Sequence, residues 1–359
     1  MAVRRRRGST AALALTAALS VGSALLLTAC GPDDTASSAA SSPAATLTAS
    51  SAPTGKGTAP SPSAARSGTP AAGGSATPSG PAAPTRGTGV PHLTISNGTD
   101  LVQMPDAVVD FHTQVRDLAW APDGSAAVFI SGNGDLVTAK PDGTGRIVVA
   151  KNPGGQTWSH PTWVMTMPDP QVGLPHRNTI IFTADQGGTT RLMQVRGDTT
   201  NGTPAALPLS AGAPGDNGPV TLPQTANTWA DAGGTHGSIA YENTADGSVY
   251  IRDDYTRQQG YKLTAGSEPA LSPDGNEVVF VRSVGGHDHL FEVQLGQNTI
   301  TPQDLTPKAT TDYTEPAFSP DGKEITARTP NGTATLPADG SLTPHPGAYT
   351  VPGLPAYRP

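Results

Sequence analysis

The stretch Ala317-Phe318-Ser319-Pro320-Asp321-Gly322 occurs three times in the chain with small changes. Residues 270–275 read Ala-Leu-Ser-Pro-Asp-Gly, and residues 119–124 read Ala-Trp-Ala-Pro-Asp-Gly. The apolar residues of each copy suit the end of a strand. Pro-Asp-Gly favours a tight turn, because proline presets φ, aspartate bonds nearby backbone and glycine accepts positive φ. A strand and turn repeated in this way predict an array or a propeller.

Two weaker copies bring the number of repeat units to five. One covers residues 161–169 and ends in Pro168-Asp169, and the other covers residues 228–233, with Asp231 taken as its turn aspartate. Each unit contains four β-rich runs separated by polar turns, which is the size of one propeller blade. The units are expected to begin near residues 117, 160, 227, 268 and 315.

The two ends of the repeat region predict a sixth blade. Residues 355–359 match the strand before the turn at residues 269–273, and residues 95–102 resemble residues 130–137. We therefore expect the carboxyl end to supply the first strand of a blade and the amino end to supply its later strands. Such pairing closes a ring and removes most of its free strand edges. The predicted fold is all-β, a six-bladed propeller of four-stranded antiparallel blades. An open array, a smaller propeller with an irregular tail and a seven-bladed ring are the alternatives.

The first residues predict export from the cytoplasm. Arg4 to Arg7 form a charged segment, residues 13–27 are apolar, and Leu27-Thr28-Ala29-Cys30 resembles the bacterial lipobox. Cys30 is the only cysteine, so we expect residues 1–29 to be a lipoprotein signal peptide and Cys30 to carry the lipid. The protein would then be anchored to the outer face of the cytoplasmic membrane. An ordinary signal peptide with a chance cysteine is the alternative.

Residues 30–90 are rich in Ala, Ser, Thr, Pro and Gly and contain no aromatic residue. Such a composition buries too little apolar surface to offset chain entropy, and it predicts a disordered tether before a propeller at residues 91–359. Cleavage of the signal removes four arginines and no acids, which changes the formal charge from −7 to −11. We therefore expect no nucleic-acid partner, because nucleic-acid binding relies on lysine and arginine. A monomer is expected.

The repeats closely resemble the WD40-like repeats of TolB-type six-bladed propellers. The resemblance covers about residues 91–359 and is specific in the units at 117, 268 and 315 but weak in those at 160 and 227. It implies an extracytoplasmic propeller that acts in protein–protein contacts. TolB itself carries an α/β domain before the propeller, where this chain has the tether. Its role in the Tol–Pal system therefore does not carry over with the fold.

One set of residues stands two positions before the shared alanine of each unit. In a propeller the first strand of each blade lines the central channel, so equivalent positions are expected to form a ring at one channel mouth. We expect this partly acidic ring to attract a cation or a basic group of a partner, with a raised pKa or a counter-ion among its acids. The alternative is that the acids bond neighbouring backbone N–H groups. The ring residues are Asp117, His160, Glu268 and Glu315, with Leu354 and approximately Ala226 in the remaining two units.

The chain contains no Gly-x-Ser-x-Gly elbow, no phosphate-binding loop and no His-Glu-x-x-His. His287-Asp288-His289 is a weak candidate for part of a metal site on an exposed hairpin loop. No cofactor is expected. The first hypothesis for function is therefore a non-enzymatic, membrane-anchored scaffold that binds an envelope protein or peptide. The second is a channel that binds a small polar ligand or a divalent cation, and the third is a hydrolase or lyase built on the propeller.

Overall fold

The computed structural model describes residues 84–171, 173–209, 222–252, 260–297, 299–341, 343–346 and 353–359. The predicted signal peptide, Cys30 and most of the predicted tether lie outside these residues. By contacts the chain divides into residues 1–73 and 74–359, and every described residue belongs to the second unit. Within the described ranges, no helix has the length and hydropathy needed to cross a bilayer.

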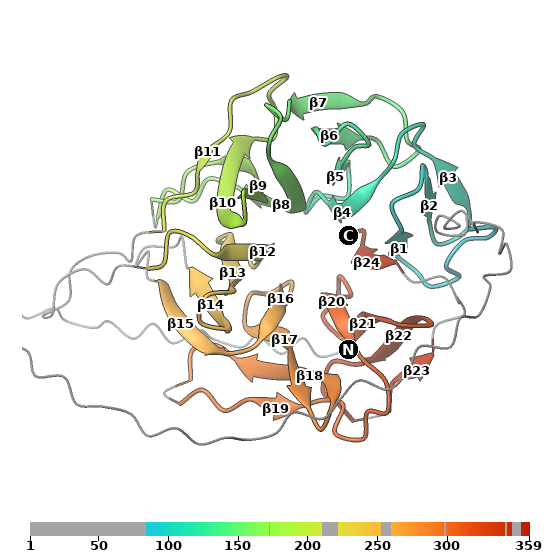
Figure 1. Cartoon of the computed structure of the whole chain (residues 1–359), viewed down its shortest axis with the longest axis vertical. Coiled ribbons are helices and arrows are strands. Elements are labelled where there is room, and N and C mark those ends of the chain that lie inside the picture. The colour runs from blue at the N-terminus through green and yellow to red at the C-terminus, as the bar shows by residue number, and fades with distance from the viewer. Residues whose placement is uncertain are drawn as a thin grey trace, which may run out of the picture. The chain divides into compact units, whose positions relative to one another are not determined.

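Six four-stranded antiparallel sheets surround a common axis (Figure 1). We number these blades in chain order and list each from the inner strand outward. Blade 1 consists of β4 (Arg116–Trp120), β5 (Ala127–Ile130), β6 (Leu136–Ala139) and β7 (Ile147–Ala150). Blade 2 consists of β8 (Thr157–Thr166), β9 (Arg177–Gln186), β10 (Thr189–Arg196) and β11 (Ala205–Ala206). Blade 3 consists of β12 (Asn227–Gly233), β13 (Ser238–Asn243), β14 (Ser248–Arg252) and β15 (Gly260–Ala265).

The other three blades complete the ring. Blade 4 consists of β16 (Ser267–Leu271), β17 (Glu277–Val284), β18 (His287–Gln294) and β19 (Gln303–Asp304). Blade 5 consists of β20 (Thr314–Phe318), β21 (Glu324–Thr329), β22 (Gly332–Pro337) and β23 (His345–Pro346). Blade 6 consists of β24 (Leu354–Tyr357), β1 (Leu93–Ser96), β2 (Leu101–Gln103) and β3 (Val108–Asp110). The predicted fold class and the number of blades are confirmed.

Blade 6 joins the two ends of the propeller, as the sequence predicts. Strand β24 pairs with β1 in antiparallel register, from Leu93 opposite Tyr357 to Ser96 opposite Leu354. The Thr94 hydroxyl donates to the Ala356 carbonyl at 2.8 Å and accepts from Trp120 Nε1 of blade 1 at 2.9 Å. The closing strand is therefore fixed to its own blade and, through Thr94, to the next one.

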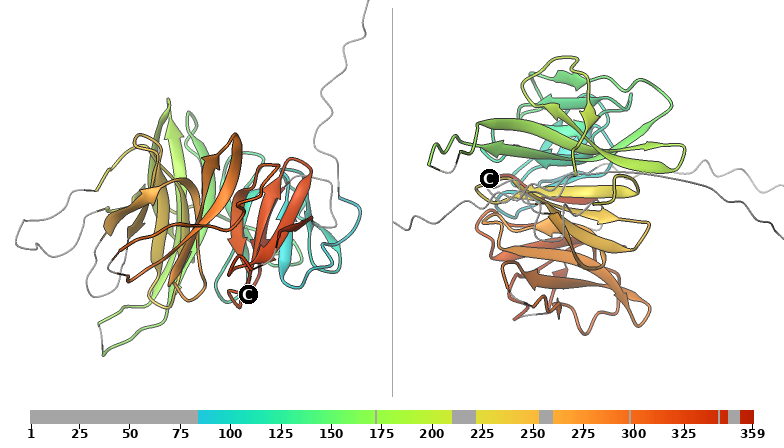
Figure 2. Two further views of the ribbon diagram at one scale, coloured as in Figure 1. Left: turned by 90° about the horizontal axis from the view of Figure 1, so that it is seen from below. Right: turned by 90° about the vertical axis from the view of Figure 1, so that its left-hand side faces the viewer.

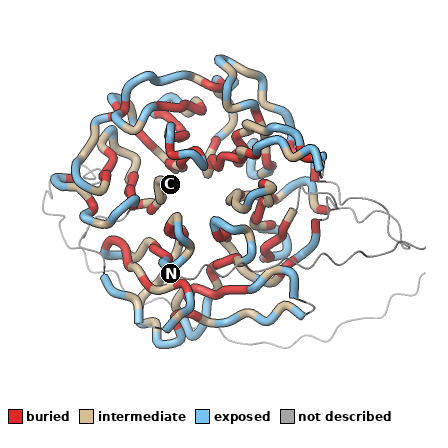
Figure 3. The backbone as a smooth tube through the Cα atoms, turned by 180° about the vertical axis from the view of Figure 1, so that it is seen from behind, coloured by how far each residue is buried: buried red, intermediate tan, exposed pale blue. Residues whose placement is uncertain are grey.

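The hydrophobic core lies between neighbouring blades, because each of its main clusters joins residues of two adjacent blades. In Figure 3 buried segments occur in every blade, and exposed segments are most frequent at the outer rim. Four blades place an aromatic residue at one position of the second strand, and all four side chains are fully buried. Full burial of such a side chain contributes about 1.5–3 kcal/mol. These aromatics hold adjacent sheets face to face, and they are Phe129, Phe182, Tyr241 and Phe280.

The turn after the inner strand follows the prediction in blades 1, 4 and 5 and departs from it in blades 2 and 3. In blade 5, Gly322 N donates to the Ser319 carbonyl at 2.9 Å, and the same bond recurs in blades 1 and 4. In blade 2, Pro168-Asp169 lies in a longer connection, and the β8–β9 hairpin extends past the other blades (Figure 2). In blade 3 the assignment of Asp231 to a turn is wrong, because Asp231 pairs with Ala240 inside strand β12.

Candidate functional site

The inner strands of blades 1 to 5 share a β-bulge near their start. The register of each inner strand shifts by one residue at this point, for example between Arg116 and Ala119 or between Thr314 and Ala317. One residue of each bulge adopts left-handed backbone, which costs an L-residue roughly 1–2 kcal/mol. The five residues, with φ between 47° and 55°, are Asp117, His160, Trp229, Glu268 and Glu315.

The bulge places all four predicted ring residues at equivalent positions of their blades. The fifth equivalent residue is Trp229 rather than Ala226, because the shift in blade 3 falls between Thr228 and Asp231. Blade 6 has no bulge, and Leu354 pairs directly with Ser96. The five bulge residues, which we call the bulge level of the channel, are therefore three acids, a histidine and a tryptophan.

Side chains of one blade bind the bulge N–H groups of the next blade at four junctions. Two of the acceptors belong to the predicted ring: Asp117 Oδ2 accepts from His160 N at 3.1 Å, and Glu268 Oε2 accepts from Glu315 N at 2.7 Å. At the other two junctions the acceptor comes from a second strand, with Thr183 bonding Trp229 N and Glu242 bonding Glu268 N. These bonds satisfy backbone groups that the bulge removes from the sheet.

Burial and like charge act together on the acids of blades 3 to 5. Burial and, to a smaller extent, the charges of Glu315, Glu242 and Asp288 together raise the pKa of Glu268 to about 7, although the bond from Glu315 N opposes the shift. Burial also raises the pKa of Glu315, although Arg328 Nη1 donates to its carboxylate at 2.8 Å. The other oxygen, Oε2, is buried and has no hydrogen-bond partner among the described residues.

Two of the five bulge residues, His160 and Trp229, form an aromatic pair. The rings of His160 and Trp229 stack across the junction of blades 2 and 3 with centroids 3.7 Å apart and planes inclined by 35°. Burial lowers the pKa of His160, and the charge of Asp117 opposes this shift. His160 therefore tends to be neutral at pH 7, and its imidazole packs as an aromatic plate beside Trp229.

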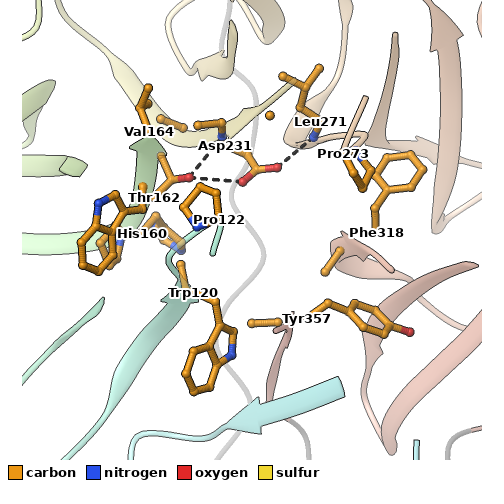
Figure 4. A pocket seen from close by; sticks show the side chains of 18 of the residues that line it. Trp120, Pro122, His160, Thr162, Val164, Asp231, Leu271, Pro273, Phe318 and Tyr357 are labelled. Atoms are coloured by element: carbon orange, nitrogen blue, oxygen red, sulfur yellow. Dashed lines mark hydrogen bonds between the residues drawn. The ribbon is translucent and has the colours of Figure 1, made fainter. Parts of the chain in front are cut away.

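A cavity of about 380 Å³ occupies the axis and is lined by the inner strands of all six blades (Figure 4). Asp117 and His160 line it, whereas Glu268 and Glu315 are not among its lining residues. Trp120, Phe318, Tyr357 and several prolines are among the residues that line it. No lysine or arginine lines the cavity in the part of the chain that the structure describes. Polar and apolar surface thus contribute about equally to the cavity wall, and its carboxylates make the polar part negative rather than positive.

Asp231 is the charged residue that the sequence analysis did not place in the channel. Its Oδ2 accepts from Leu271 N of blade 4 at 2.8 Å, and its Oδ1 accepts from the Thr162 hydroxyl of blade 2 at 3.4 Å (Figure 4). Burial raises the pKa of Asp231 to about 6, and these hydrogen bonds oppose the shift. A carboxylate thus lies halfway along the channel wall, bridging three blades.

The registers of the bulged strands show what usually occupies this position. Thr162 takes the place in blade 2, and the remaining four blades have alanine. When the inner strands are aligned on the bulge, instead of on the Pro-Asp-Gly turn, Asp231 occupies the position that is alanine in four other blades. The four alanines are Ala119, Ala270, Ala317 and Ala356.

The His287-Asp288-His289 segment lies in strand β18 rather than in an exposed loop. His289 is buried, and its Nδ1 is 2.9 Å from Asp304 Oδ2. His287 Nδ1 is 3.2 Å from Asp312 Oδ1. The two imidazoles thus have separate carboxylate partners. No group of three or more His, Cys, Asp or Glu side chains suited to a metal occurs within the described ranges.

Comparison with known proteins relates the fold to envelope propellers. Residues 92–227 match the model of the "Lipoprotein LpqB beta-propeller domain" family. No curated protein matches the chain in sequence. TolB from Acinetobacter baumannii is 17% identical, with a TM-score of 0.50 over 74% of this chain and 66% of that chain.

Two further structures have lower scores. A putative TolB from Agrobacterium tumefaciens is 16% identical, with a TM-score of 0.49 over 74% of this chain and 98% of that chain. Oligogalacturonate lyase in complex with manganese is 11% identical, with a TM-score of 0.45 over 68% of this chain and 69% of that chain. The described part of the chain is therefore a six-bladed β-propeller similar in fold to that of TolB, and its residues 92–227 are similar to the LpqB propeller domain.

Proposed function

We propose that the protein is a lipid-anchored, non-enzymatic scaffold of the bacterial cell envelope that binds another protein or a peptide through its propeller. The observation that carries this proposal is the closed six-bladed ring around an open axial cavity, in a fold similar to TolB. The match of residues 92–227 to a lipoprotein propeller model supports an envelope location. The lipobox-like sequence ending in Cys30 supports anchoring through that cysteine.

The cavity makes the axis the favoured contact region. It is bounded at one end by the bulge level, with Asp117 and Trp229, and at the other by the turn prolines, including the exposed Pro273. A partner segment that entered the cavity would bury aromatic and proline surface, which is the usual content of a binding pocket.

Photocrosslinking in intact cells tests this proposal and separates the two ends of the channel. A benzophenone amino acid is placed at Trp229, at Pro273 or, as a control, at Ile147, which is 46% exposed on the outer strand β7. We expect one discrete protein adduct from Trp229 or Pro273 and none from Ile147. Absence of an adduct from both axial positions, in a folded and membrane-retained protein, would contradict the proposal.

The lipid anchor has its own test. Cys30→Ser is expected to release the protein from the membrane fraction, because the acyl chains would no longer be attached. Retention of the Cys30→Ser variant in membranes would show that another part of the chain provides the attachment.

A second candidate function is a channel that binds a small cation without a protein partner. The carboxylates of Asp117 and Asp231 in the cavity wall favour it. Added Ca²⁺ would then raise the melting temperature and EDTA would lower it, because a ligand of the native state stabilises that state by mass action.

A further inference from the structure

The axial cavity combines aromatic and proline surface with a carboxylate, Asp231, that the equivalent position of the other blades lacks. Four blades have alanine where blade 3 has Asp231, and those blades join their neighbours by the same inner-strand packing. A carboxylate removed from bulk water is costly unless it has partners. Its presence in one blade only is therefore a feature of the cavity rather than of the repeat.

Asp231 retains room for another partner. A carboxylate has about four acceptor positions, and the described contacts are one bond from Leu271 N at 2.8 Å, a longer one from the Thr162 hydroxyl at 3.4 Å and an interaction with Ala232 N. Its raised pKa of about 6 still leaves it mostly ionised at pH 7.5. A positively charged donor in the cavity would thus meet a largely charged acceptor.

The route to Asp231 suits a long side chain with a charged end. Trp229 lies two residues earlier on the same strand and stacks with His160 at the bulge level. An aliphatic stem can pack along these rings while its cationic head reaches deeper, and a cation is also attracted by an aromatic face. Glu242 and Glu268 lie near this mouth outside the cavity lining, and they add negative potential only to the extent that they are ionised, because burial raises the pKa of both.

We propose that the cavity receives a lysine or arginine side chain carried by the protein partner, with the cationic head against Asp231 and the stem along Trp229. The proposal rests on the protein-binding function proposed above and specifies the chemistry of the partner. Charge complementarity supports it, since Asp117 and Asp231 line the cavity and no described lining residue is a lysine or an arginine. The aromatic part of the wall, with Trp229, Phe318 and Tyr357, favours a side chain with a methylene stem over a bare metal ion, which prefers several oxygen ligands.

Binding of short peptides to the full-length protein tests the proposal. The probes are acetyl-Ala-Lys-Ala-amide, the same peptide with arginine, and the isosteric but uncharged norleucine peptide. Calorimetry and tryptophan fluorescence report binding. We expect the lysine or arginine peptide to bind at least about tenfold more tightly than the norleucine peptide, which corresponds to about 1.4 kcal/mol for a partly buried ion pair.

Variants then locate the charge effect. Asp231→Asn keeps the shape and an acceptor for Leu271 N, and Asp231→Ala recreates the residue found in four sister blades. Both are expected to abolish the preference for the charged peptide. Asp106→Asn is the matched control, since Asp106 is exposed outside the cavity and its loss changes the net charge equally. It is expected to leave the preference intact.

Three results would overturn the proposal. These are equal binding of the lysine and norleucine peptides, an unchanged preference in both Asp231 variants, and equally effective competition by Ca²⁺, which would indicate a small-cation site. The comparison of peptides on the unmodified protein needs no variant, so it holds even if a substitution impairs folding. Axial crosslinks without any peptide preference would leave the protein-binding function standing and refute only the basic side chain.

Discussion

The six-bladed ring contains two groups of blades whose inner strands differ in sequence. One group consists of blades 1, 4 and 5, and the other consists of blades 2 and 3. The first group keeps alanine in the channel wall and ends its inner strands in Pro-Asp-Gly turns. The second group has Thr162 and Asp231 in the wall, His160 and Trp229 at the bulge, and irregular turns. Both groups place their inner strands around the same axis (Figure 1). The repeat residues therefore build the ring, and three of the polar residues that line the cavity, His160, Thr162 and Asp231, lie in the two blades that depart from the repeat.

The largest effect is expected from opening the ring. Ending the chain after residue 353 removes β24, so β1 loses its partner and Trp120 loses support at the junction of blades 6 and 1. We expect a loss of more than half of the ~5–15 kcal/mol typical of a folded domain, measured by denaturant unfolding. Tyr357→Phe is the control, since it removes only the 2.8 Å bond to Thr326 and should cost about 1 kcal/mol. Equal effects of the two changes would show that closure contributes little.

The next effect is the pH dependence of stability that Glu268 contributes. Its pKa is about 7 in the folded protein against 4.5 for an ordinary glutamate, so the folded state holds the proton more tightly. The stabilisation is fully present below pH 4.5 and is lost as the pH rises through 7. Each pKa unit corresponds to about 1.4 kcal/mol, so the melting temperature should fall by several degrees between pH 5 and pH 8.

Two variants separate the contribution of Glu268 from general effects of pH. Glu268→Gln keeps an acceptor for Glu315 N but cannot ionise, and we expect it to flatten the fall. Glu324→Gln removes an exposed carboxylate and should leave the fall unchanged. Asp231, with a pKa of about 6, contributes in the same direction at lower pH. A pH profile that is identical in Glu268→Gln and the parent protein would refute this assignment.

A smaller effect is expected at the junction of blades 1 and 2. Asp117→Ala removes the acceptor of His160 N, which lies at 3.1 Å, and should cost about 1 kcal/mol, or roughly 2–4 °C in melting temperature. Asp117→Asn retains an amide oxygen for the same bond and should recover most of this loss. Failure of the asparagine variant to recover stability would mean that charge, and not the hydrogen bond, supports the bulge.

The smallest change in stability should follow from placing an aspartate in blade 5 at the position that Asp231 occupies in blade 3. In Ala317→Asp the new carboxylate would have Tyr357 N of blade 6 as a donor. Arg358 N bonds His92 O, so the alternation of an antiparallel pair turns Tyr357 N toward the channel. We expect a melting temperature within about 3 °C of the parent and a stronger preference for lysine peptides. Failure to fold would show that the wall tolerates a carboxylate only at blade 3.

The ring can be predicted from the sequence because each regular blade contains a Pro-Asp-Gly turn, which marks the same position in every such blade. Pro-Asp-Gly fixes where each inner strand ends, and the match between residues 355–359 and the other inner strands predicted the pairing of β24 with β1. Both signals are local, so they could be found without knowing which blades touch. The structure confirms them in full.

The cavity could not be predicted to the same extent, for a physical reason. Asp231 lies two residues before Gly233-Gly234, and an aspartate close to glycine is also typical of the Pro-Asp-Gly turn. The local sequence therefore predicts a turn at Asp231, although the residue lies inside strand β12. Only the position of the bulge, which depends on pairing with β13, shows that its side chain faces the axis. Likewise, the bond from His160 N to Asp117 joins residues 43 positions apart in neighbouring blades. Contacts of this kind follow from packing and leave no local pattern.

The pairing of β24 with β1 also determines the order in which the molecule can be completed. Thr94 and Ala356 are 262 residues apart, so their contact is among the slowest kind to form. Until it forms, β1 presents a row of unsatisfied backbone groups, which is a template for aggregation. A chain in which this contact has not yet formed would have an incomplete sheet in blade 6. The unpaired edge of β1 therefore distinguishes an incompletely folded molecule from a folded one. A chaperone or a quality-control protease would bind the incompletely folded molecule at this edge.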